Sequence, residues 1–170
     1  MEMKLTKSQR LIAHAAADKD SKRDVLKCIH FREGMIEATN GFALVQKDAP
    51  DCTEDILLES APIARMKDWK SLGAVWLRNG NGDEVKLIGE PETTICKQQG
   101  TYPKTDGLYP TTKPVFQITL AKNILVDMLK CMEINSTICF TFYGKDSPVK
   151  FEVTNDDEHT RGMVMPIHTV

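Results

Sequence analysis

The chain has 170 residues, of which 41% are hydrophobic, 6% aromatic and 27% charged, and its formal net charge is −2. These values fit a globular protein of one domain, or of one and a half small ones. No apolar run approaches the ~18 residues that a membrane span needs. The slightly negative charge argues against a protein that grips nucleic acid over its whole surface, although local basic stripes remain compatible with it.

A pattern of one strand, a short basic helix and three further strands occurs three times along the chain. The opening strands are Met3–Thr6, Ile56–Glu59 and Phe116–Thr119, so the units start about 53 and 60 residues apart. That spacing is typical of a repeated supersecondary unit, although the three units share almost no residue identity. The pattern predicts an α+β fold with antiparallel sheets and with basic helices on one side.

The first helix is expected to begin at Thr6, with Gln9 as its capping-box partner. Its apolar face is predicted to consist of Leu11, Ile12, Ala15 and Ala16. At ~100° per residue the cationic side chains fall on roughly the opposite side, and these are Lys7, Arg10 and His14. An ordinary solvated face is the alternative interpretation. Three strands are expected next, at 25–31, 34–39 and 41–46, with Asn40-Gly41 as a hairpin turn.

The second helix is expected to start with Ser60 as its N-cap and to end at Gly73. Its buried stripe is predicted to contain Ile63, Met66 and Trp69. Its positive charge comes from Arg65, Lys67 and Lys70. The expected strands after it are 74–78, 84–88 and 93–97.

Residues 102–114 contain three prolines and show no periodicity, which indicates a connector and the best boundary in the chain. The third unit is expected to open with a strand at 115–119. Its helix carries an apolar stripe at near-perfect helical spacing, formed by Ala121, Ile124, Leu125, Met128, Leu129 and Met132. Such a stripe is usually core. The helix cations are Lys122 and Lys130, and strands are expected at 137–143, 148–153 and 162–167.

Five cysteines form an odd set without any C-x-x-C pair: Cys28, Cys52, Cys96, Cys131 and Cys139. Most of them lie in apolar segments, as buried thiols of a reducing compartment do. The first residues turn polar immediately, so we expect no secretory leader and a cytoplasmic location.

No catalytic constellation stands out in the sequence. The four histidines are scattered and lack metal-ligand spacing. The acidic stretch 156–159 could suggest a metal, but a solvated turn is the better interpretation. We therefore expect a binding protein that is not an enzyme and that needs no metal and no cofactor.

Three segments resemble motifs of the bacterial DNA polymerase III beta sliding clamp. Ile36 to Leu44 resembles the family's "ATDG-aromatic-R-L" turn, and Gly100 to Pro110 resembles its "G-x-F-P-D" stretch. Gly162 to Ile167 resembles the terminal "V-V-M-P-M" strand. By this resemblance, residues 1–110 correspond to the clamp's middle domain, and residues 111–170 to the second half of its last domain.

The resemblance implies a ring protein whose channel helices attract duplex DNA without reading its sequence. The residues that would do so here are Lys7, Arg10, Arg65, Lys70, Lys122 and Lys130. The family also binds linear peptides from polymerases and other partners in an apolar cleft. Carried over by motif, that cleft would use Thr39, Gly41, Phe42, Leu44, Pro110, Met163 and Met165. The alternative is that its apolar members are ordinary strand core, and Ala43 stands where the family usually has Arg.

The resemblance thus implies a processivity factor or clamp-like accessory of DNA replication or repair. Its partners would be duplex DNA, polymerase-type peptides and a clamp loader. A rival interpretation is a clamp-derived peptide-binding module that never encircles DNA. The third unit has no companion within the chain, so we expect a homo-oligomer: at least a dimer, with a four-chain ring as a further alternative.

Overall fold

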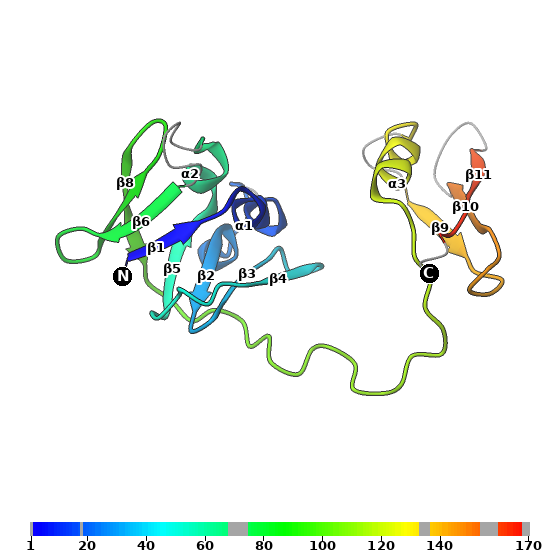
Figure 1. The fold of residues 1–170 in the computed structure, drawn as a ribbon, viewed down its shortest axis with the longest axis horizontal. Coiled ribbons are helices and arrows are strands. Elements are labelled where there is room, and N and C mark those ends of the chain that lie inside the picture. Colours follow the sequence, from blue (N-terminus) through cyan, green and yellow to red (C-terminus); the bar gives the residue numbers. More distant parts are fainter. Residues whose placement is uncertain (1, 18, 68–74, 133–136, 154–159, 168–170) are drawn as a thin grey trace. The chain divides into compact units, whose positions relative to one another are not determined.

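A computed structural model describes residues 2–17, 19–67, 75–132, 137–153 and 160–167. The chain forms two compact units, Met1–Thr105 and Asp106–Val170, with the boundary inside the proline-containing connector (Figure 1). Each unit is described by itself below.

The first unit is built on an antiparallel sheet of eight strands. The strands are β1 (Glu2–Leu5), β2 (Cys28–Arg32), β3 (Met35–Thr39), β4 (Leu44–Asp48), β5 (Ile56–Glu59), β6 (Val75–Asn79), β7 (Glu84–Ile88) and β8 (Thr93–Gln98). Their order across the sheet is β1-β6-β7-β8-β5-β2-β3-β4. The first repeat contains β1 to β4 and the second contains β5 to β8. The opening strand of each repeat pairs with a strand of the other, since β1 pairs with β6 and β5 pairs with β2. The two repeats therefore interlock into one curled sheet.

Short helices follow the two opening strands. They are α1 (Lys7–Arg10) with the 3₁₀-helix η1 (Leu11–Ala15), and α2 (Ser60–Arg65); a second 3₁₀-helix, η2 (Asp24–Lys27), precedes β2. The predicted capping box is present, because Thr6 Oγ1 accepts from Gln9 N and Thr6 N donates to Gln9 Oε1. The α-helix then tightens into η1, which has about three residues per turn. Ile12 is buried as predicted, but this change of pitch leaves Leu11 50% exposed and buries Ala13 in its place.

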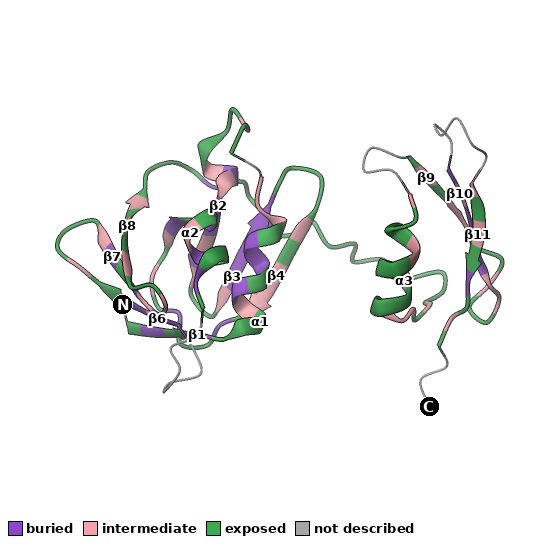
Figure 2. Ribbon diagram, turned by 90° about the horizontal axis from the view of Figure 1, so that it is seen from above, coloured by how far each residue is buried: buried purple, intermediate pink, exposed green. Residues whose placement is uncertain are grey.

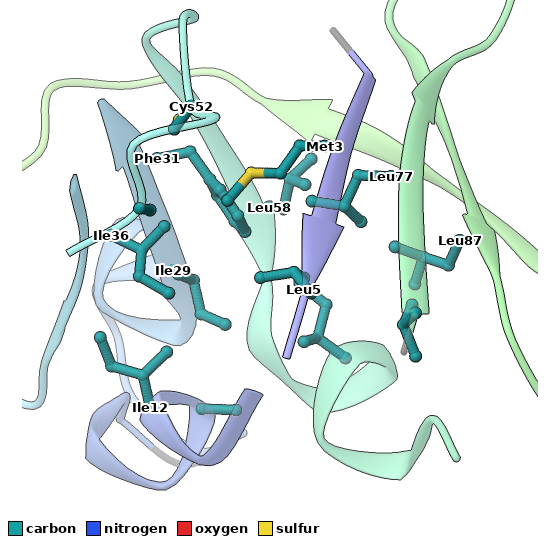
Figure 3. Packing of buried hydrophobic residues seen from close by; sticks show 14 of the residues in the cluster. Met3, Leu5, Ile12, Ile29, Phe31, Ile36, Cys52, Leu58, Leu77 and Leu87 are labelled. Carbon is teal, nitrogen blue, oxygen red and sulfur yellow. The ribbon is translucent and has the colours of Figure 1, made fainter. Parts of the chain in front are cut away.

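Alternate strand residues and both helices supply the core of the first unit. Met3 and Leu5 face it from β1, whereas Glu2 and Lys4 are exposed, as the period of two requires. Figure 3 shows side chains from β1, β2, β3, β5, β6 and β7 in one cluster with Ile12 of η1. Ile63 of α2 belongs to the same cluster, in which each helix closes one part of the sheet.

The second unit is smaller. It contains α3 (Lys122–Leu129) and a three-stranded antiparallel sheet of order β11-β10-β9, formed by β9 (Ile138–Thr141), β10 (Val149–Val153) and β11 (Arg161–Val164). Among its described residues, the buried apolar side chains lie on the sheet: Val149, Phe151, Val153 and Val164. No residue of α3 is buried (Figure 2). The predicted core stripe of this helix is therefore exposed or half-buried in the single chain.

Several expected elements need correction. Residues 115–119 form no strand, although Thr119 O accepts a hydrogen bond from Ile167 N at 2.7 Å. The segment 25–27 is part of η2 rather than of a strand. Ser60 is the first helical residue rather than the N-cap, and α2 ends at Arg65. The expected end at Gly73, and Trp69 of the expected stripe, lie outside the described residues.

The thiols also differ from expectation. Cys28 and Cys52 are buried, whereas Cys96, Cys131 and Cys139 are exposed. Burial raises the pKa of the Cys28 thiol to about 11. Among the described residues, no helix has the length and hydropathy that crossing a membrane requires.

Candidate nucleic-acid and peptide interfaces

The helices of the first unit present cations, but they do not present all of the predicted ones. Lys7 and Arg65 are exposed, and Arg65 Nε donates to Ala61 O of its own helix at 3.2 Å. Arg10 is buried, and its guanidinium donates to the carbonyl of Met66. It therefore ties α1 to the end of α2 rather than lying on a solvated face. Lys70 lies outside the described residues.

A cavity of about 270 Å³ lies between these two helices. Its described lining consists of Lys7, Arg10, Leu11, His14, Ala64, Met66 and Lys67, without a carboxylate among them. Grouped cations without a carboxylate among the described lining residues favour a positive local potential in this hollow. Lys67 joins this group in space, which the spacing along one helix could not predict.

The predicted cations of the second unit lie at the two ends of α3. Lys122 is exposed at the first helical position, where it has no acidic neighbour in the first turn. Lys130 Nζ forms an exposed ion pair with Asp127 Oδ1 at 3.1 Å. An exposed ion pair of this kind is weak, so Asp127 competes only weakly with a phosphate for Lys130.

The turn between β3 and β4 is held by side-chain hydrogen bonds and carries a fully exposed aromatic ring. Asn40 Oδ1 accepts from the backbone N–H groups of Phe42 and Ala43, both at 2.9 Å. Thr39 Oγ1 donates to Ala43 O at 2.6 Å and accepts from Gly41 N at 3.0 Å. Gly41 has a φ of +92°, a backbone conformation that residues with a side chain rarely adopt. The loop therefore spans 40–43 rather than the two residues expected.

Phe42 is 100% exposed at the tip of this turn, and Leu44 is half-buried at the start of β4. Thr39 is buried, so its hydroxyl builds the turn and does not face a ligand. In the second unit, Met163 and Met165 are 69% and 58% exposed. The alternative that Phe42 and these methionines are strand core is therefore wrong. Pro110 is exposed in the connector.

A larger cavity of about 610 Å³ lies on the second unit. It is lined by Tyr143, Ser147, Pro148, Lys150, Arg161, Gly162 and Met163. Lys150 and Met163 are direct cross-strand partners, so they share the face of the sheet opposite Val149 and Phe151. Lys150 Nζ pairs with Glu152 Oε1 at 2.9 Å. The alternating burial of β10 was readable from the sequence, but the contribution of Tyr143 from the loop after β9 was not.

No group of three or more metal-ligating side chains occurs in the part of the chain that the structure describes. The acidic stretch 156–159 lies outside it.

Comparisons with known proteins give a fold but no close relative. No family model matches the sequence, and no curated protein matches it significantly. Solved structures of bacterial clamps do match. One is the DNA polymerase III subunit beta of Pseudomonas aeruginosa, with 15% identity and a TM-score of 0.66 over 98% of this chain and 51% of that one.

Two further matches come from distant bacteria. The beta subunit of Borrelia burgdorferi has 11% identity and a TM-score of 0.67 over 97% of this chain and 47% of that one. The beta chain of Streptococcus pneumoniae has 16% identity and a TM-score of 0.61 over 99% and 50%. The expectation of a clamp-like α+β fold is confirmed: this chain has the DNA sliding-clamp fold and spans about half the length of the clamps it matches.

Proposed function

We propose that this protein is a clamp-like accessory of DNA replication or repair that contacts duplex DNA without reading its sequence. The observation that carries the proposal is the cationic hollow between α1 and α2, where Lys7, His14 and Lys67 gather and where the described lining contains no carboxylate. Lysines attract phosphates as point charges, which gives affinity without base recognition. Further DNA contacts would come from Arg65, Lys70, Lys122 and Lys130. Arg10 would act indirectly, by holding α1 against the end of α2.

A charge reversal within the first unit tests the proposal. Lys7→Glu combined with Lys67→Glu should lower the affinity for duplex DNA at least tenfold at low salt. The slope of log K against log salt should fall by about two, because two phosphate contacts are lost. Lys4→Glu combined with Lys86→Glu is the matched control, since both lysines are exposed on strands on the face away from the core. Equal losses in both double variants would show only a net-charge effect and would refute the site.

The proposal includes peptide binding at the apolar surfaces that the clamp motifs mark. Its support is the exposure of Phe42, Met163 and Met165 and the cavity beside Met163. A polymerase-type peptide with apolar anchors should bind with micromolar affinity, about −8 kcal/mol. Met163→Asp or Met165→Asp should abolish binding by placing a charge in an apolar site. Val115→Asp is the control, because Val115 is 98% exposed in the connector. Undiminished binding by both methionine variants would contradict this assignment.

A second copy of the chain would complete the second unit. Ile124, Val126 and Leu129 of α3 are at least 38% exposed, and exposed apolar surfaces of this kind often mark interfaces. We propose a homodimer through α3, with the four-chain ring as its closed form, a clamp loader as a further partner and a cytoplasmic location. A purified chain that stays monomeric at tens of micromolar would instead favour the peptide-binding module that does not encircle DNA.

A further inference from the structure

A buried carboxylate lies on the face of the first sheet that is opposite to its helices. Glu37 of β3 is 1% exposed. Its Oε1 accepts a hydrogen bond from His30 Nδ1 at 2.8 Å and forms an ion pair with Arg32 Nε at 3.6 Å. Its Oε2 accepts from Gln46 Nε2 at 2.7 Å and from Thr105 Oγ1 at 2.6 Å. The proposed DNA and peptide contacts use none of these groups.

The four donors differ in origin. His30, Arg32 and Gln46 come from β2 and β4, the two strands that flank β3. Thr105 comes from the connector, 68 residues further along the chain, and is 3% exposed. The hydroxyl of Thr105 therefore reaches the sheet from outside it, whereas the other donors are already beside Glu37.

Glu37 can hold this hydroxyl because it is ionised. Burial by itself would raise the pKa of its carboxyl, but hydrogen bonds from Thr105, Gln46 and His30, and the charge of Arg32, outweigh burial and lower that pKa. An ionised carboxylate only accepts hydrogen bonds, so Oε2 needs the O–H of Thr105 or another donor in its place. A hydrogen bond to a buried charge is among the stronger ones in proteins.

Apolar contacts hold the same stretch of connector. Tyr102 is 8% exposed, belongs to a small cluster with Cys28 and Leu57, and places its ring 4.7 Å from that of His30. The approach of this stretch to the sheet is close, because a Cβ built on Gly100 would lie 2.6 Å from Cγ1 of Val25. Gly100 also has a φ of +139°, which favours glycine. Residues 100–105 thus form a strap across the outer face of the sheet.

We propose that the Thr105–Glu37 hydrogen bond latches this strap and fixes where the free connector to the second unit begins. With the latch closed, the free connector runs from 106 to 118, because Thr119 O already accepts a hydrogen bond from Ile167 N of the second unit. Release of residues 100–105 adds six residues, or roughly 20 Å of extended chain, to the reach of the second unit. The latch stands apart from the proposed DNA and peptide contacts, so it can hold even where those proposals fail.

Proteolysis and hydrogen exchange of the full chain test the latch. Lys104 is exposed but lies between the buried Tyr102 and Thr105, whereas Lys145 lies in the exposed turn before β10 and serves as an internal reference. Thr105→Val removes only the hydroxyl donor. It should raise the rate of tryptic cleavage after Lys104, relative to Lys145, at least tenfold. Thr105→Ser, which keeps the hydroxyl, should restore slow cleavage, and Thr101→Val at an exposed neighbouring position should have no effect.

Amide exchange separates the latch from general destabilisation. In Thr105→Val, cleavage after Lys104 should rise while the amides of β6 and β7 keep their protection, because the strap opens without unfolding the sheet. Cleavage after Lys104 that is unchanged in Thr105→Val would overturn the proposal. So would Thr105→Ser behaving like Thr105→Val, because packing rather than the hydroxyl would then hold the strap. Loss of protection in β6 and β7 of Thr105→Val would overturn it as well, because the cleavage would then report unfolding of the whole sheet.

Discussion

The two units contain the same kind of helix in different surroundings. In the first unit, η1 and α2 contact each other and both place side chains in a common core. In the second unit, α3 lies beside three strands and buries no residue. The difference follows from pairing, because two interlocked repeats enclose their helices, whereas one repeat leaves its helix half covered. The comparison teaches that the apolar stripe of such a helix becomes core only when a second repeat covers it.

One isoleucine in a helix of each unit gives the largest expected difference between the two units. Ile63 of α2 is 1% exposed and Ile124 of α3 is 52% exposed. Ile63→Ala should lower the free energy of unfolding of the first unit by about 2–5 kcal/mol, because it opens a cavity in a closed core. Ile124→Ala should change the stability of a dilute monomer by less than about 0.5 kcal/mol. Urea unfolding followed by amide exchange in each unit measures both values.

The same pair tests the proposed dimer. At high protein concentration Ile124→Ala should weaken self-association, whereas Ile63→Ala should affect folding alone. If Ile124→Ala costs several kcal/mol in the dilute monomer, α3 is buried within the single chain and the contrast between the units disappears.

The buried carboxylate makes the stability of the first unit depend on pH. The pKa of Glu37 is lowered in the folded state, so its ionised form stabilises the fold above about pH 4.5, the ordinary value, and this contribution is lost as the pH falls through the lower folded value. Glu37→Gln should cost on the order of 1–3 kcal/mol at pH 7 and should flatten the fall below pH 4.5. Both tryptophans, Trp69 and Trp76, belong to the first unit, so fluorescence-detected urea unfolding from pH 7 to 3 follows this unit alone. Parallel acid curves for the variant and the parent would contradict the role of Glu37.

Helix capping should give the smallest contrast. Thr6 caps α1 through a complete capping box, whereas Ala121 stands at the N-cap of α3 without a side-chain hydrogen bond. Thr6→Ala should destabilise the first unit by about 1 kcal/mol, and Ala121→Ser should stabilise α3 by up to about 1 kcal/mol. Thermal unfolding followed by circular dichroism measures both changes. The two substitutions should change stability in opposite directions. A loss of stability in Ala121→Ser would show that the start of α3 lies elsewhere.

Local signals predicted much of this fold. The strands near 3–6 and 84–88, the capping box at Thr6 and a turn at Asn40 each depend on neighbouring residues, and the structure contains them, although the turn is a four-residue loop rather than the expected two-residue one. The burial of Arg10 could not be predicted in this way, because it depends on the carbonyl of Met66, 56 residues away. The same holds for Glu37, which alternation places on the outer face of the sheet and which the distant connector covers. Among the candidate site residues, the exposure of Phe42 and Met163 also depends on contacts between segments rather than on residue type.

The unequal exposure of the cysteines provides natural labelling sites for measuring a distance between the two units. Cys96 is exposed on β8 of the first unit, and Cys131 and Cys139 are exposed in the second, while Cys28 and Cys52 are buried. Low-reactivity buried thiols remain unlabelled under mild conditions. Replacing either Cys131 or Cys139 with serine therefore leaves one reactive thiol in each unit. A spin or dye pair attached there reports the distance between the units in solution, with DNA, with a peptide or after release of the strap.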